Sequence, residues 1–208
     1  MRIVPFLALL FFSQITFSQT NKNFKSLEEA LGKPVEVKVL DLRGQNLSEL
    51  SNDILKLENL EKIDLSYNNF TTFPTPLLKL KKLKILFLNN NSISVLPNEI
   101  TDMIQLVNLR LDVNPFLNPV AELKKISALS NLVIFNFSAN KVSSFPVELL
   151  KLTKIADLDL SYGTIKVLPL EIDKLKSLKK LNLAKNSLTA FPLGFFKLSK
   201  LENLDLSY

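Results

Sequence analysis

The chain has 208 residues and a formal net charge of +6, with 47% apolar and 22% charged residues. This balance is ordinary for a folded globular protein and argues against a disordered chain. The sequence contains neither histidine nor cysteine, which removes the usual residues for acid–base catalysis near neutral pH, thiol chemistry and zinc binding. We therefore expect no enzymatic activity, no cofactor and no metal site.

Residues 1–18 have the composition of a secretory signal peptide. Arg2 precedes an apolar run at residues 3–12, and Thr16 and Ser18 are small residues at the −3 and −1 positions of a cleavage site. An uncleaved membrane anchor would need about 20 apolar residues, and this run is half that length. No later segment is apolar for long enough to span a membrane. The pattern predicts cleavage after Ser18 and export, either to the outside of the cell or to the periplasm or cell surface.

Residues 19–36 predict a short helix that caps the N-terminal end of the fold. A capping box at Ser26 and Glu29 begins the helix, and Gly32 followed by Pro34 ends it. Such a helix would cover the apolar edge of the first strand and keep the fold soluble.

From residue 37 to residue 208 the sequence repeats one unit. The first apolar position of the unit recurs every 23 residues, apart from one interval of 26, at Val37, Leu60, Leu83, Leu106, Leu132, Ile155, Leu178 and Leu201. Apolar residues follow at the fourth, sixth and eleventh positions, asparagine occupies the ninth position in five units, and a Leu-Pro or Phe-Pro step follows in five. A period in this range indicates a solenoid, in which each unit buries its apolar face against its neighbours.

These positions resemble the leucine-rich repeat family, in its 23-residue bacterial and Ras-suppressor-like subclass. The asparagines of the motif are Asn68, Asn91, Asn114, Asn140 and Asn186, and the exceptions at that position are Gln45 and Gly163. The resemblance covers residues 37–208 as seven full repeats and a truncated eighth. It implies an α/β horseshoe with a parallel β-sheet on the concave face and short helical, 3-10 or extended segments on the convex face.

The asparagine position has a physical reason. A side-chain amide offers two donors and an acceptor, which can satisfy backbone groups where the chain turns off the strand. Gln45 is one methylene longer and Gly163 has no side chain, so these two turns are predicted to be looser or filled with water.

The interval of 26 residues follows Asn114 and lacks the Leu-Pro step. Asn118 as N-cap, with Pro119 at the first helical position, predicts a true α-helix here. We interpret the longer element as an insertion that alters the local curvature; the alternative is a bend next to a ligand site.

The resemblance also bears on the compartment. Exported animal and plant proteins of this kind usually close their ends with disulfide-bonded caps, and this chain has no cysteine. We therefore expect a bacterial exported protein. The four Asn-x-Ser/Thr triplets are interpreted as products of asparagine-rich turns.

The basic charge does not indicate nucleic-acid binding. Such proteins concentrate their charge and use arginine, whereas this chain has three arginines and lysines that recur between the strands. These lysines are predicted to form a solvated convex and lateral surface, with contact to an anionic cell envelope as the alternative.

The predicted binding site lies on the concave sheet, where relatives of this architecture commonly bind proteins. Most units carry Asp or Asn at the fifth position, but two adjacent units carry Phe87 and Arg110. An exposed aromatic residue beside arginine is typical of an interface hot spot. The predicted patch spans about 15 Å. Its residues are Tyr67, Ile85, Phe87, Asn108, Arg110, Asp112 and Ile134.

The sequence thus predicts a non-enzymatic, secreted leucine-rich repeat protein that binds a protein partner or a cell-surface ligand through this patch. The alternative is an adhesive or structural repeat segment of a larger cell-surface protein. The eighth unit stops at Tyr208 without a polar cap. Truncation is the favoured explanation, and self-association through the open strand edge is the alternative.

Overall fold

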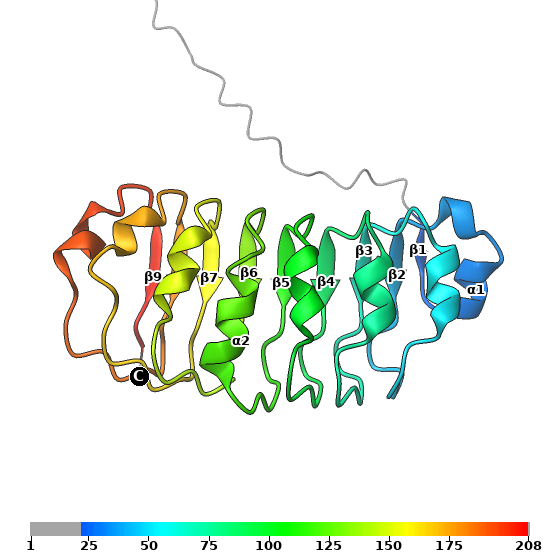
Figure 1. Ribbon diagram of the computed structural model, residues 1–208, viewed down its shortest axis with the longest axis horizontal. Helices are drawn as coiled ribbons and strands as arrows, with labels where there is room; N and C mark the ends of the chain where they lie inside the picture. Colours follow the sequence, from blue (N-terminus) through cyan, green and yellow to red (C-terminus); the bar gives the residue numbers. More distant parts are fainter. Residues whose placement is uncertain (1–21, 208) are drawn as a thin grey trace, which may run out of the picture.

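The computed structural model describes residues 22–207, so the predicted signal peptide at residues 1–18 lies outside the described residues. The described part forms one open parallel sheet of nine strands in sequence order. Figure 1 shows the strands side by side along the long axis of the molecule, with the helical segments across one face. The strands are β1 (Asn23–Phe24), β2 (Val39–Asp41), β3 (Lys62–Asp64), β4 (Ile85–Phe87), β5 (Asn108–Arg110), β6 (Ile134–Asn136), β7 (Asp157–Asp159), β8 (Lys180–Asn182) and β9 (Asn203–Asp205).

Within residues 22–207, the helical segments on that face are two α-helices and a series of short 3-10 helices. These are α1 (Leu27–Leu31), η1 (Pro34–Glu36), η2 (Asn52–Lys56), η3 (Thr75–Lys79), η4 (Asn98–Asp102), α2 (Pro119–Ile126), η5 (Val147–Lys151), η6 (Ile172–Lys174) and η7 (Leu193–Lys197). The predicted α/β solenoid is therefore confirmed. None of the helices in the described part of the chain has the length and apolarity needed to cross a lipid bilayer.

The apolar positions of the repeat form the core. In the second repeat, Leu60, Ile63, Leu65 and Phe70 are each at most 1% exposed. Neighbouring strands pair residue by residue, so that the same position of each repeat lies in one row across the sheet; Asp64 pairs with Phe87, for example. The register is kept across the 26-residue interval, because the additional residues lie in α2 and not in the sheet.

The N-terminal helix begins as predicted, but a strand precedes it. The Ser26 hydroxyl accepts a hydrogen bond from the Glu29 N–H at 3.1 Å, and the Glu29 carboxylate accepts from the Lys25 N–H at 3.4 Å. Gly32 ends the helix in the right-handed region. No pattern in the sequence predicted β1, a two-residue strand in a polar segment, and its second residue, Phe24, is fully buried.

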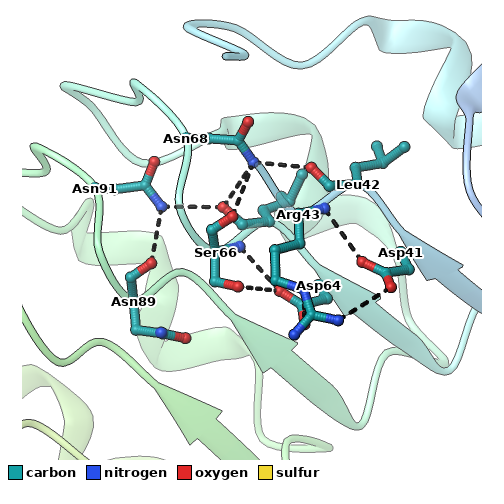
Figure 2. Close-up of polar contacts among 9 residues, drawn as sticks. Asp41, Leu42, Arg43, Asp64, Ser66, Asn68, Asn89 and Asn91 are labelled. Carbon is teal, nitrogen blue, oxygen red and sulfur yellow. Dashed lines mark hydrogen bonds and ion pairs between the residues drawn. The ribbon is translucent and has the colours of Figure 1, made fainter. Parts of the chain in front are cut away.

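Buried asparagine side chains connect successive repeats. The Asn68 Nδ2 group donates to the carbonyl oxygens of Leu42 at 2.9 Å and Leu65 at 3.0 Å; Figure 2 shows the bond to Leu42. The Oδ1 atom of Asn68 accepts from the N–H groups of Gln45 and Leu47. Corresponding carbonyl contacts recur at Asn91, Asn114, Asn140 and Asn186. Each of these side chains thus satisfies backbone groups of its own repeat and of the repeat before it.

The two exceptions at the ninth position behave differently. A depression of about 490 Å³ opens beside Gln45, whose Nε2 donates to the Lys25 carbonyl at 2.6 Å. The predicted loose turn is wrong at Gly163. A Cβ atom there would lie 2.5 Å from the Val142 carbonyl oxygen and 2.7 Å from Asn186 Oδ1, so the chain closes tightly against its neighbours and only glycine fits.

The eighth position of every full repeat has a left-handed backbone. The residues are Gly44, Tyr67, Asn90, Val113, Ala139, Tyr162 and Lys185, with φ between 54° and 68°. This conformation costs a residue other than glycine about 1–2 kcal/mol. Each N–H at this position still donates to the next repeat, as in the bond from Tyr67 to the Asn89 carbonyl at 3.0 Å, which offsets the cost.

The predicted α-helix in the long interval is present. Asn118 is its N-cap and accepts through Oδ1 from the Ala121 N–H at 3.1 Å, and Pro119 is its first residue. In this repeat α2 replaces the Leu-Pro step and the short 3-10 helix that follow the strand elsewhere.

We predict that Asn114→Ala strongly destabilises the solenoid. Asn114 is 4% exposed, and its loss would leave the Leu88 and Leu111 carbonyls and the Ile93 N–H without this partner. We expect a loss of about 3 kcal/mol, since each buried group left unsatisfied costs about 1–3 kcal/mol. Urea unfolding measures it. Asn69→Ala, at an exposed position, is the control; equal losses in both variants would contradict the proposed role of Asn114.

Candidate protein-binding site on the concave sheet

The strand register brings most of the predicted patch together. Ile85, Asn108 and Ile134 lie in one row of adjacent strands, and Phe87 pairs with Arg110 in the next row. Asp112 follows two residues after Arg110. Tyr67 is placed differently, because it lies at the left-handed turn after β3, beyond the strand rows, where it is 58% exposed.

Two cations lie over the ring of Phe87. The Arg110 Cζ atom, from β5, is 4.9 Å from the ring centroid, and the Lys62 Nζ atom, from β3, is 5.3 Å from it. Lys62 was not in the predicted patch. It occupies the same row as Ile85 and Asn108, so the repeat alignment could have indicated it. The three side chains form a cationic cluster, which we call the Lys62–Phe87–Arg110 cluster.

Aspartate and asparagine at the fifth position have a structural role. Their side chains accept a hydrogen bond from the backbone N–H two residues further on, as Asp64 does from Ser66 at 2.9 Å (Figure 2). Six repeats make this contact, at Asp41, Asp64, Asn136, Asp159, Asn182 and Asp205. Phe87 cannot accept a hydrogen bond and Arg110 has only donors, so these two adjacent repeats give up the contact.

Two buried acceptors flank Arg110 on the same strand segment. Within residues 22–207, the Oδ1 atoms of Asn108 and Asp112 are both buried and have no hydrogen-bond partner. Burial raises the pKa of the Asp112 carboxyl to about 6, Arg110 opposes this rise, and Asp159 adds to it. Because a buried acceptor without a partner costs free energy, these atoms are suited to receive donors from a bound molecule.

Two aspartates, Asp157 and Asp159, lie further along the sheet on β7. Burial raises the pKa of Asp157, Lys180 opposes that rise, and Asp159 adds to it. Within the described residues, no group of three or more Asp, Glu, His or Cys side chains could hold a metal ion. The concave face is therefore basic around Phe87 and acidic beyond Asp112.

An ion pair between buried Glu122 and partly buried Lys125 supports the patch from the convex side. Glu122 of α2 is 3% exposed; its Oε2 lies 3.1 Å from Lys125 Nζ and accepts from the Leu96 N–H at 3.1 Å. Lys125 Nζ donates to the Leu96 carbonyl at 2.6 Å. Leu96 belongs to the repeat of Phe87 and α2 to the repeat of Arg110, so this clamp fixes the two repeats relative to each other.

A match to a family model extends over most of the chain. The model, described as a leucine-rich repeat region, matches residues 6–163, and the chain belongs to the leucine-rich repeat family. This family and fold are typical of non-enzymatic binding scaffolds. No curated protein sequence matches the chain.

Solved structures agree with this assignment. A leucine-rich repeat protein of Leptospira interrogans is similar with a TM-score of 0.64 and 31% identity, over 88% of this chain and 58% of that protein. The ectodomain of the Arabidopsis thaliana receptor kinase GASSHO1/SCHENGEN3, in complex with Casparian strip integrity factor 2, gives 0.66 and 27%, over 89% and 22%. An internalin of Listeria monocytogenes gives 0.63 and 22%, over 91% and 59%, and shows the fold alone. The chain thus spans less than two thirds of each of these proteins.

We predict that Asp112→Asn stabilises the protein at pH 7 and not in acid. Between pH 3.8 and about 6 the folded state binds more protons at Asp112 than the unfolded state, so stability falls as pH rises through this window. Two pKa units correspond to about 3 kcal/mol, and partial exposure to water reduces the expected gain to about 1–2 kcal/mol. Urea unfolding at pH 7 and at about pH 3.5 measures the gain.

The exposed substitution Asp102→Asn is the control for this experiment, and we expect it to change stability by less than about 0.5 kcal/mol at either pH. An equal gain for Asp112→Asn at both pH values would show that ionisation of Asp112 is not its cause.

We predict that Glu122→Ala destabilises the fold by about 2–4 kcal/mol, because it leaves Lys125 without its buried counter-charge and the Leu96 N–H without an acceptor. Glu122→Gln keeps an acceptor and should lose less. Thermal and urea unfolding measure both variants against Glu99→Ala, at an exposed position on η4. A loss no larger than that of Glu99→Ala would mean that the clamp does not hold the repeats together.

Proposed function

We propose that this protein is exported and binds another protein through the concave patch of Tyr67, Ile85, Phe87, Asn108, Arg110, Asp112 and Ile134, with Lys62 added. The leucine-rich repeat fold favours a role in protein–protein interaction. Export is proposed from the signal-peptide pattern at residues 1–18, with residues 19–36 as the cap of a repeat domain that runs from residue 37 to residue 208.

One observation carries the placement of the site. Six repeats use the fifth side chain to bind their own backbone, and the two that do not are adjacent and present Phe87 and Arg110 instead. Each hydrogen bond given up costs the fold about 0.5–1.5 kcal/mol. Loss of stability at two neighbouring positions is typical of residues retained for binding.

The surroundings of this pair fit a protein partner. Ile85 and Ile134 are half-buried apolar side chains in the adjacent row, and they supply area that a partner can cover. The free Oδ1 atoms of Asn108 and Asp112 can accept from backbone or side-chain N–H groups of that partner. An apolar centre with a few fixed polar groups is the composition of a binding hot spot.

The decisive variant restores the repeat pattern. Phe87→Asp/Arg110→Asp should regain the two backbone hydrogen bonds. It also places four aspartates side by side in the fifth row, at positions 41, 64, 87 and 110, which offsets the gain, so we expect stability within about 1 kcal/mol of the wild type, while capture of a partner falls at least about tenfold. The measurement is pull-down from envelope and host-cell extracts, together with urea unfolding. Asp205→Asn, in the same row on β9, keeps the acceptor for the Ser207 N–H and is the control. Undiminished capture by the double variant would remove this patch as the binding site.

A further inference from the structure

The Lys62–Phe87–Arg110 cluster leaves three electropositive groups facing the concave space. Both neighbouring strands place a cation over the Phe87 ring, so the negative ring face is already occupied. An aromatic ring has a positive edge. Because Lys62 and Arg110 approach the Phe87 ring from the two neighbouring strands, this edge points away from both strands. The edge, the ammonium group and the guanidinium group together favour an anion.

Nearby carboxylates do not neutralise these cations. Within residues 22–207, neither Lys62 nor Arg110 forms an ion pair. Asp64 pairs with Phe87 across the sheet, but its Oδ1 accepts from Ser66 and its Oδ2 lies 4.0 Å from Arg43 Nε. Asp112 and Asp157 attract Arg110 only at longer range. The positive charge around Phe87 is therefore available to a bound molecule.

We propose that the protein partner places an aspartate or glutamate side chain against the half-buried ring of Phe87, where Lys62 and Arg110 bind its carboxylate. The inference rests on the proposed function and specifies its chemistry. Ile85 pairs with Lys62 in the same row of the sheet, so the acidic residue of the partner is flanked by an apolar one. Asp112, on the far side of Arg110, excludes a second carboxylate there and accepts a donor instead.

This arrangement also explains why the site uses arginine and lysine together. Arg110 has a planar group that can bind a carboxylate through two N–H donors while it stacks on the ring, and Lys62 adds a point charge from the other side. A carboxylate bound between them makes charge-assisted hydrogen bonds that a neutral side chain cannot replace. Reversal of both charges should therefore reverse the preference of the site and not merely weaken it.

The test is selection from a phage-displayed library of random dodecapeptides on the purified protein. The wild type should enrich peptides in which Asp or Glu adjoins an aliphatic or aromatic residue. With Lys62→Glu/Arg110→Glu, these peptides should bind at least about tenfold more weakly, and new selections should enrich Lys or Arg. Lys174→Glu/Lys197→Glu, at exposed positions on the convex side, changes the net charge equally and should leave the wild-type preference intact. Circular dichroism confirms folding of each variant.

The outcomes separate this inference from the proposed function. Enriched peptides without an acidic preference, whose binding is lost in Phe87→Asp/Arg110→Asp, would overturn the carboxylate assignment and leave the patch as the site. Equal weakening by the concave and convex charge reversals would also overturn it, because attraction would then depend on net charge alone. If the wild type enriches nothing beyond what Phe87→Asp/Arg110→Asp enriches, the patch does not bind peptides and both proposals fail.

Discussion

The buried side-chain amide at the ninth position of the repeat is the interaction on which the rest of the structure depends. It donates to carbonyl groups of two successive repeats at the point where each chain turns away from the sheet. These carbonyls lie in an apolar interior, where water cannot replace the missing partner. Because each amide joins neighbouring repeats in one fixed register, equivalent residues align in rows across nine strands. Two adjacent repeats that differ from the repeat pattern at the same position therefore place the differing side chains next to each other.

The patch depends on that alignment and on its support from behind. Asp and Asn side chains at the fifth position accept a hydrogen bond from their own backbone, whereas Phe87 and Arg110 do not. The clamp of Glu122, Lys125 and Leu96 joins the same two repeats on the opposite face. A site whose two central side chains are fixed relative to each other loses little entropy when a partner binds. The two repeats that lack the fifth-position hydrogen bond on the concave face thus have an additional contact, the clamp, on the convex face.

The sequence predicted the features that follow from the 23-residue repeat. It missed the features that depend on contacts between residues of different repeats. The spacing of apolar residues determined the strands, their register and the neighbours of Phe87, and Asn118 with Pro119 predicted α2. Tyr67 and Val113 carry no turn signal, so their left-handed backbone could not be recognised. Glu122 and Lys125 have the spacing of an exposed helical pair, and only the packing of α2 on Leu96 buries Glu122 and partly buries Lys125. Gly163 was predicted to leave a loose turn, because the close approach of the Val142 carbonyl depends on how tightly two repeats stack.

The three additional residues of the long interval affect how such a chain can change in length. Adding or removing one regular repeat of 23 residues would keep the register of the others. Each strand and each asparagine would still lie next to an equivalent neighbour. The 26-residue repeat is not interchangeable, since it supplies both Arg110 on the sheet and the helix that holds Leu96. Its loss would remove half of the patch together with the support of the other half. Phe87 and Arg110 therefore depend on two adjacent repeats that form one structural unit.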